Sequence, residues 1–351
     1  MSARGEESKA RPAERGATTL AVPRAAWWLP GPHLPTIFGK VFRRVPQPPT
    51  TRERWRTPDG DLLSVERLRG RPDAPRLVLF HGLEGGLHST YVRGLLNQAY
   101  QRGWWADLVL WRTCDGETVN AVRRSYHSGA SDDADLALTH IVSSDPDRPV
   151  LLHGVSLGGN VLLKWLGERG DAVPASVRAA VAVSVPFDLA AASARIDRGL
   201  SKVYGRFFLK TLKAKTAAKL SRFPDVIDPA VLAGIRTLWD FDELVTGPVH
   251  GFGGAAEYYA RSSSINFLSR IRVNTLLLNA RNDPFLPPST LDRVTSITRG
   301  NPNVTCCFPP SGGHVGFIAG RNPGDADYWM ERVTLDWLES SADGSFNKKH
   351  I

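Results

Sequence analysis

A serine lies between two glycines in the segment Gly154-Val155-Ser156-Leu157-Gly158, which follows the apolar residues 150–152 and His153. A strand, a sharp turn and a helix in that order form a nucleophile elbow, whose strained turn pushes the serine Oγ away from the backbone. The flanking glycines carry no Cβ, so the strand and the helix can pass close together. The segment therefore predicts a serine that attacks an acyl carbon. An ordinary glycine–serine turn is the alternative for the motif taken alone.

A serine nucleophile needs a base and an acid that orients the base. Asp283 follows the expected strand 274–279, and His314 follows the expected strand 304–308. Ligands meet open α/β sheets beyond the carboxyl ends of the strands, so we expect both side chains to meet Ser156 there. The order serine, acid, histidine is also the chain order of hydrolases with such an elbow. Ser156, Asp283 and His314 are therefore the predicted catalytic residues.

Other acids and histidines compete for these roles. Asp188 also lies just past a strand end, and Asp283 in its Asp-Pro pair is also a turn former. His250 is the weaker alternative base, because it precedes the last two expected strands. His153 comes before the elbow and is expected to pack beneath it, and His81 is expected to support a loop.

An acyl-transfer site also needs two N–H groups that hold the developing oxyanion. One is expected from Leu157, the residue after the nucleophile. The other is expected from Leu83, in the loop His-Gly-Leu-Glu-Gly-Gly at 81–86 that follows the expected strand 77–80. A glycine-rich turn without a role in catalysis is the alternative for this loop.

Near-continuous apolar runs alternate with helical patterns along the chain, which indicates a mostly parallel sheet with helices on both faces. The interval 187–271 is too long for one crossover and predicts a helical cap over the strand ends. We expect a disordered terminus over 1–20, one domain over 21–340 and a polar tail over 341–351. The expected strands are 77–80, 106–111, 150–153, 178–185, 274–279 and 304–308, and the expected helices include 91–102, 132–142 and 327–339.

The composition excludes several classes of protein. Three cysteines make no disulfide framework, residues 1–20 contain no apolar signal segment, and no apolar run is long enough to cross a membrane. These observations predict a cytoplasmic protein. The segment 251–256 formally fits a dinucleotide fingerprint but follows no good strand, and no histidine–cysteine spacing suggests zinc. No cofactor and no metal are therefore expected.

The formal net charge of +9 is unevenly distributed. Residues 195–222 hold nine lysines and arginines against one acid, Asp197. Lys202, Arg206, Lys210 and Lys213 recur at helical spacing, with Val203, Phe207, Phe208 and Leu212 on a different face. A solvated cap helix is the simplest interpretation. Peripheral contact with an anionic membrane, or steering of an anionic acyl substrate, is the alternative. No nucleic-acid module is recognisable, so no nucleic-acid partner is expected.

Several longer motifs are spread along the chain, and they include the segments discussed above. They are GPHLPT at 31–36, HGLEGG at 81–86, YHSG at 126–129, HGVSLGGN at 153–160, FDELVTGPVHGF at 241–252, NARNDPF at 279–285 and GGHVGF at 312–317. Together they resemble the YheT-like branch of the α/β-hydrolase superfamily, which includes ABHD-type hydrolases and fungal medium-chain ester synthases. The likeness spans about residues 27–338. The segment Trp-Arg-Thr-Cys-Asp-Gly at 111–116 departs from the usual pattern of the branch.

The resemblance implies an α/β-hydrolase fold and carries a catalytic triad onto Ser156, Asp283 and His314. It implies a serine hydrolase that cleaves esters of short- or medium-chain acyl groups, such as a carboxylesterase or a monoacylglycerol-lipase-like enzyme. The expected partner is a small acyl ester. Two alternatives stay open: an acyltransferase that uses the same acyl-enzyme, and a non-catalytic protein of the membrane surface.

Overall fold

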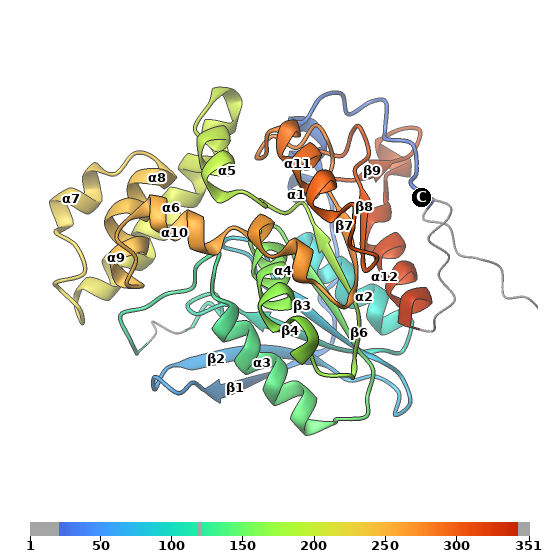
Figure 1. Ribbon diagram of the computed structural model, residues 1–351. Coiled ribbons are helices and arrows are strands. Elements are labelled where there is room, and N and C mark those ends of the chain that lie inside the picture. Colours follow the sequence, from blue (N-terminus) through green and yellow to red (C-terminus); the bar gives the residue numbers. More distant parts are fainter. Residues whose placement is uncertain (1–20, 118–120, 343–351) are drawn as a thin grey trace, which may run out of the picture.

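The computed structural model describes residues 21–117 and 121–342 (Figure 1). The terminus expected to be disordered and most of the polar tail lie outside these residues. A central sheet carries helices on both faces, and a group of further helices lies beyond one end of the sheet. The predicted α/β-hydrolase architecture is confirmed.

The central sheet has the strand order β1-β2-β4-β3-β5-β6-β7-β8. The first two strands pair antiparallel, as do β2 and β4, and all later neighbours pair parallel. Parallel strands place their carboxyl ends at one edge, so the loops after β3, β5, β7 and β8 meet there. The strands are β1 (Thr50–Arg56), β2 (Leu62–Leu68), β3 (Arg76–Phe80), β4 (Trp105–Leu110), β5 (Val150–Val155), β6 (Val177–Val183), β7 (Asn274–Leu278) and β8 (Val304–Cys307).

Alternate residues of each strand face opposite sides of the sheet and form two apolar cores. In β3, Val78 and Phe80 join the core under α3, α4 and α11, whereas Leu77 and Leu79 join the core under α2 and α12. Burial on both faces explains why these strands read as continuous apolar runs. The surrounding helices are α1 (His33–Val41), α2 (Thr90–Gln101), α3 (Ser131–Ser144), α4 (Leu157–Arg169), α11 (Pro288–Thr298) and α12 (Trp329–Ala342).

Helices fill the long connection between β6 and β7 and carry a small apolar core of their own around Leu209, Ile235 and Phe241. Short 3-10 turns, η4 (Ser264–Asn266) and η5 (Leu268–Arg270), lead back to β7. These cap helices are α5 (Leu189–Ile196), α6 (Lys202–Leu220), α7 (Pro229–Gly234), α8 (Leu238–Phe241), α9 (Gly247–Val249) and α10 (Ala255–Ser262), with a π turn over Asp242–Thr246 between α8 and α9.

Two details differ from the sequence predictions. The last helix begins at Trp329 rather than at residue 327, because Asp327–Tyr328 pairs as β10 with β9 (Ile318–Ala319). The cations of α6 do not form one solvated face either. Lys213 donates to the carbonyls of Ala233 and Ile235, and these hydrogen bonds tie α6 to the end of α7.

Within the described chain, no helix has both the length and the apolar character needed to cross a membrane.

Candidate active site

The elbow occupies the junction of β5 and α4. Ser156 lies between the last residue of β5 and the first residue of α4, with φ 53° and ψ −120°. This left-handed conformation is strained for a residue that has a Cβ, and it lifts the side chain out of the turn. A Cβ on Gly154 would lie 2.7 Å from the Gly158 carbonyl oxygen, and a Cβ on Gly158 would overlap the backbone of Phe80. Both flanking glycines are therefore required by close backbone contact.

The structure brings the three predicted side chains together. His314 Nε2 lies 3.1 Å from Ser156 Oγ, and His314 Nδ1 lies 2.9 Å from Asp283 Oδ2. Asp283 is only 3% exposed, and its other oxygen accepts a hydrogen bond of 2.8 Å from the Phe285 N–H. This arrangement fixes the carboxylate, and the carboxylate in turn orients the imidazole with Nε2 toward the serine.

The loop that carries His314 is held by polar groups from distant parts of the chain. Thr36 Oγ1 accepts a hydrogen bond of 2.8 Å from the His314 N–H, and Ser184 Oγ accepts one of 3.0 Å from the Val315 N–H. The side-chain oxygen of Asn282 accepts from the N–H groups of Gly312 and Gly313. The histidine therefore lies on a loop whose backbone is fixed on both sides of residue 314.

The loop after β3 approaches the nucleophile closely. A Cβ on Gly82 would lie 3.1 Å from Ser156 Cβ, and the Gly82 N–H donates to Tyr91 Oη at 2.9 Å. Among the residues that the structure describes, none accepts a hydrogen bond from the N–H of Leu83 or of Leu157. Two unused N–H groups beside a serine Oγ have the chemistry of an oxyanion hole.

His81 holds this loop in place. Its Nδ1 lies 2.7 Å from the Gly82 carbonyl oxygen, and its Nε2 lies 3.1 Å from the Trp111 N–H. Burial lowers the pKa of His81 to about 3. A neutral ring with the proton on Nδ1 satisfies both contacts, because Nδ1–H donates to the carbonyl and Nε2 accepts from Trp111.

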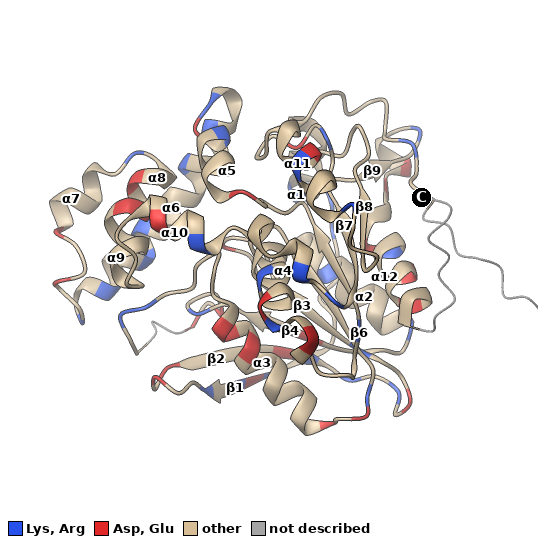
Figure 2. Cartoon of the chain, in the orientation of Figure 1, with Lys and Arg blue, Asp and Glu red and all other residues tan. Residues whose placement is uncertain are grey.

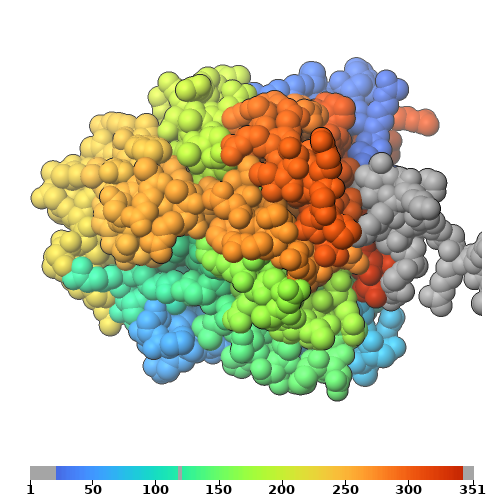
Figure 3. All heavy atoms as spheres, in the orientation of Figure 1, coloured from blue at the N-terminus to red at the C-terminus, as the bar shows by residue number. Residues whose placement is uncertain are grey.

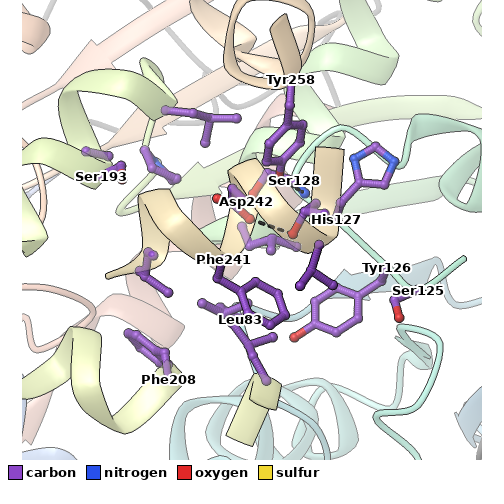
Figure 4. A pocket seen from close by; sticks show the side chains of 18 of the residues that line it. Leu83, Ser125, Tyr126, His127, Ser128, Ser193, Phe208, Phe241, Asp242 and Tyr258 are labelled. Carbon is purple, nitrogen blue, oxygen red and sulfur yellow. Dashed lines mark hydrogen bonds between the residues drawn. The ribbon is translucent and has the colours of Figure 1, made fainter. Parts of the chain in front are cut away.

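A cavity of about 160 Å³ has Ser156 and His314 in its wall. Figure 4 shows other residues that line it, among them Leu83, Tyr126 and Phe241. The body of the protein contributes Leu83 and the loop that contains Tyr126 to its wall, and the cap contributes an apolar wall. An ester with its acyl chain in this cavity would have apolar contacts on the cap side. The apolar cap residues that line the cavity include Phe208, Leu212, Leu238, Phe241 and Val245.

Ionisable groups in the cavity wall have internal partners. Lys215 Nζ donates to Glu84 Oε1 at 2.9 Å, and the same carboxylate oxygen accepts from Tyr126 Oη at 2.6 Å. Lys219 Nζ instead donates to the carbonyls of Arg123 and Arg124, and burial lowers its pKa to about 8. These two lysines of α6 thus tie the cap to the body, Lys219 from a buried position and Lys215 from a half-buried one.

A model of the α/β hydrolase fold family matches residues 75–320. YheT of Escherichia coli, which is named as an esterase, is 38% identical over 313 residues, which cover 87% of this chain and 89% of that protein. The chain belongs to the YheT-like branch of the α/β-hydrolase family. The medium-chain fatty acid ethyl ester synthase/esterase 2 of Saccharomyces cerevisiae is 30% identical over 280 residues, which cover 72% of this chain and 60% of that protein.

A solved structure agrees with this fold. The Pyrococcus furiosus esterase Pf2001 superposes with a TM-score of 0.52 and 13% identity over 84% of this chain and 90% of that one. The identity is low, so this likeness concerns the fold alone. The relatives and the family model together make the chain an esterase- and lipase-type α/β hydrolase.

In this α/β hydrolase, the competing acids and histidines lie in other networks. Asp188 caps the N-terminus of α5 by accepting from the Ala191 N–H, and it forms an ion pair of 2.7 Å with Arg293. His250 contacts the carbonyl oxygens of Thr246 and Ser125 rather than a serine hydroxyl. His153 is fully buried beneath the elbow, and its Nε2 lies 3.1 Å from Thr334 Oγ1.

Thr36, Ser184 and Asn282 hold the loop of His314, and the sequence analysis assigned a role to none of them. Thr36 ends the quoted segment 31–36, but nothing in that segment indicates that it contacts His314. Ser184 has a φ of 51° just after β6, which becomes apparent only in the folded backbone. Within residues 21–117 and 121–342, no group of three or more histidine, cysteine or acidic side chains could hold a metal ion.

Proposed function

We propose that this protein cleaves carboxylic esters of short- to medium-chain acyl groups through an acyl-enzyme on Ser156. The observation that carries the proposal is the hydrogen-bonded series from Ser156 Oγ through His314 to Asp283, at 3.1 Å and 2.9 Å, at the opening of an apolar cavity. The proposed substrate is a small acyl ester.

In the first half-reaction, His314 Nε2 takes the proton of Ser156 as Oγ forms a bond to the acyl carbon. The oxyanion that develops is held by the N–H groups of Leu83 and Leu157. His314 then gives the proton to the leaving alcohol as the ester C–O bond breaks. Asp283 accepts from Nδ1–H throughout and stabilises the imidazolium.

In the second half-reaction, water attacks the acyl carbon while His314 takes one of its protons. The tetrahedral intermediate again has its charge on the oxygen that faces Leu83 and Leu157. The bond to Ser156 Oγ then breaks, and Oγ recovers its proton from His314. The acid product leaves, and the free enzyme is restored.

The apolar side chains of the cap favour an acyl chain over a polar group in the cavity. Phe208, Phe241 and Val245 line the same cavity as Ser156. Figure 4 shows the side chains of Phe208 and Phe241 in the cavity wall. Each CH₂ group that leaves water for such a surface gains about 0.8 kcal/mol. The enzyme should therefore prefer longer acyl chains until the cavity is filled.

The test is an activity panel of p-nitrophenyl esters of increasing acyl length, run on the wild type and on Ser156→Ala. Wild-type turnover with loss of nearly all turnover in the variant supports the proposal, with a residual rate from binding and the oxyanion hole. A fluorophosphonate probe should label the wild type and not the variant. Near-normal turnover in Ser156→Ala contradicts the assignment, and failure of the probe to label Ser156 favours a non-catalytic protein.

Acyl transfer is the second candidate, because the yeast relative is named as a synthase as well as an esterase. An alcohol would replace water in the second half-reaction, and the acyl-enzyme would be the same. Product analysis with ethanol or glycerol present separates the two reactions. A new ester as the main product favours transfer, and the free acid favours hydrolysis.

A further inference from the structure

Two short helical segments expose large apolar side chains on one side of the molecule. The exposed fractions of these side chains lie between 42% and 70%. A contiguous exposed apolar surface on a folded protein commonly marks an interaction site. We call this surface the apolar patch, and it consists of Leu34, Ile37, Val41 and Phe42 from α1 and its C-terminus, and of Leu200, Val203 and Phe207 from the start of α6 and the turn before it.

Contacts between side chains show that the two halves of the patch are neighbours. The rings of His33 and Tyr204 stack at 5.8 Å, with a hydrogen bond of 3.2 Å between them. Lys40 Nζ lies 3.8 Å from the centre of the Phe207 ring. Figure 3 shows the N-terminal segment, in blue, beside the yellow-green start of α6 at the upper edge of the molecule.

Cations surround this surface, and acids are nearly absent from the segments that build it. Residues 21–47 contain no Asp or Glu, and residues 189–222 contain only Asp197. None of the exposed cations forms an ion pair with a described residue. Figure 2 shows several of them at the turn between α5 and α6. The exposed cations around the apolar patch are Lys40, Arg44, Arg195, Arg198, Lys202, Arg206 and Lys210.

We propose that the apolar patch and its cations form a docking surface for an anionic lipid bilayer. Aliphatic and aromatic side chains enter the boundary between headgroups and acyl chains, while long basic side chains reach the phosphates. The same charge argues against a second copy of this chain, because two such surfaces would repel each other. An anionic bilayer satisfies both the apolar and the charged groups.

The patch lies close to the active-site cavity. Phe207 points outward and is 53% exposed, whereas its neighbour Phe208 lines the cavity. On the same helix, the Tyr204 ring lies 4.9 Å from that of Phe285, which lies 4.2 Å from the ring of His314. Docking through this surface would place the cavity beside the bilayer, where esters of lipids are concentrated.

The experiment measures co-sedimentation with vesicles of phosphatidylcholine alone and of phosphatidylcholine mixed with phosphatidylglycerol. The wild type should partition onto the mixed vesicles far more strongly. Each basic residue near an anionic surface contributes about fivefold to the partition coefficient, so Lys202→Ala/Arg206→Ala should lower it about 25-fold. Val203→Ser/Phe207→Ser should lower it at least about tenfold, because the inserted apolar area is lost.

The matched control is Arg178→Ala/Arg299→Ala, which removes two exposed cations outside the apolar patch. Arg178 lies near the start of β6, and Arg299 directly follows α11. This variant should bind as the wild type does, and Ser156→Ala should too, because docking is independent of ester cleavage. Equal binding of the wild type to neutral vesicles overturns the proposal, as does an equal loss in the control. A concentration-dependent dimer that Val203→Ser/Phe207→Ser abolishes also overturns it, since a second copy would then cover the patch.

Discussion

The hydroxyl oxygen of Thr36 lies 2.8 Å from the backbone nitrogen of His314, 278 residues further along the chain. The Thr36 hydroxyl itself donates to the Pro32 carbonyl at 2.7 Å, so its lone pair faces the histidine loop. A Cβ on Gly313 would lie 2.6 Å from the same oxygen, which shows how closely the two segments pack. The segment before the sheet, outside the matched residues 75–320, is thus part of the support of the active site.

Thr36→Val should lower kcat about tenfold with little change in KM. The variant keeps the shape of the side chain but leaves the His314 N–H without its acceptor, so the imidazole is held less well in the position from which it takes the proton. A tenfold change corresponds to about 1.4 kcal/mol, the scale of one buried hydrogen bond. Thr36→Ser should retain activity, and Thr51→Val, at an exposed position of β1, should be neutral. Equal kcat for Thr36→Val and the wild type would show that the contact only stabilises the fold.

Asp283→Asn should lower kcat by about 10³- to 10⁴-fold while the fold is kept. The amide cannot stabilise an imidazolium, and it favours the tautomer of His314 with the wrong nitrogen protonated. Asp188→Asn is the control, because asparagine can still cap α5 and only the ion pair with Arg293 is lost. Steady-state kinetics on a soluble ester distinguish the two carboxylates. A large loss in Asp188→Asn with a small loss in Asp283→Asn would reverse the assignment.

The central sheet and the positions of Ser156, Asp283 and His314 could be predicted because each leaves a signal in a short stretch of sequence. Runs such as residues 150–152 are apolar without interruption because β5 is buried on both faces. Ser156, Asp283 and His314 each follow a strand of a parallel sheet, so their meeting point is set by topology rather than by details of packing.

The remaining parts of the site depend on contacts between distant segments. Helical spacing does not distinguish among the cations of α6. In the structure, however, half-buried Lys215 pairs with Glu84, buried Lys219 donates to backbone carbonyls, and Lys202 is exposed. The role of Thr36 could not be predicted either, because its partner is a backbone N–H that has no sequence signature.

Gly158→Ala should destabilise the protein by about 3 kcal/mol or more, because the added Cβ overlaps the backbone of Phe80 and neither β3 nor α4 can move away. Gly234→Ala is the matched control in a helix of the cap. A Cβ at Gly234 meets nothing within 4 Å, so alanine should be neutral or stabilising by up to about 1 kcal/mol. Chemical denaturation measures both variants. Similar stability of the two variants would mean that the elbow tolerates more space between strand and helix than the backbone contact indicates.

Asp242 gives a pH dependence of stability with a defined sign. Burial raises its pKa from 3.8 to about 6, although Thr246 and Tyr259 donate hydrogen bonds to its two oxygens at 2.6 Å and 2.7 Å. Between these pKa values the folded chain binds more protons than the unfolded chain, so the free energy of unfolding falls as pH rises. The stabilisation is complete below about pH 3.8 and lost as the pH rises through 6. From pH 5 to pH 7.5 the loss is on the order of 1 kcal/mol.

Asp242→Asn should remove this dependence, because the amide does not titrate. Urea unfolding should therefore show that the free energy of unfolding of the wild type, relative to that of the variant, falls by about 1 kcal/mol between pH 5 and pH 7.5. Asp73→Asn, at an exposed position, should follow the wild type at both pH values. A difference between wild type and Asp242→Asn that stays constant with pH would show that the carboxyl is already charged in the folded protein at pH 5. The cavity wall would then hold a carboxylate close to the acyl chain, and the preference for apolar acyl groups proposed above would have to come from the apolar side chains that line the same cavity, such as Phe208 and Leu212.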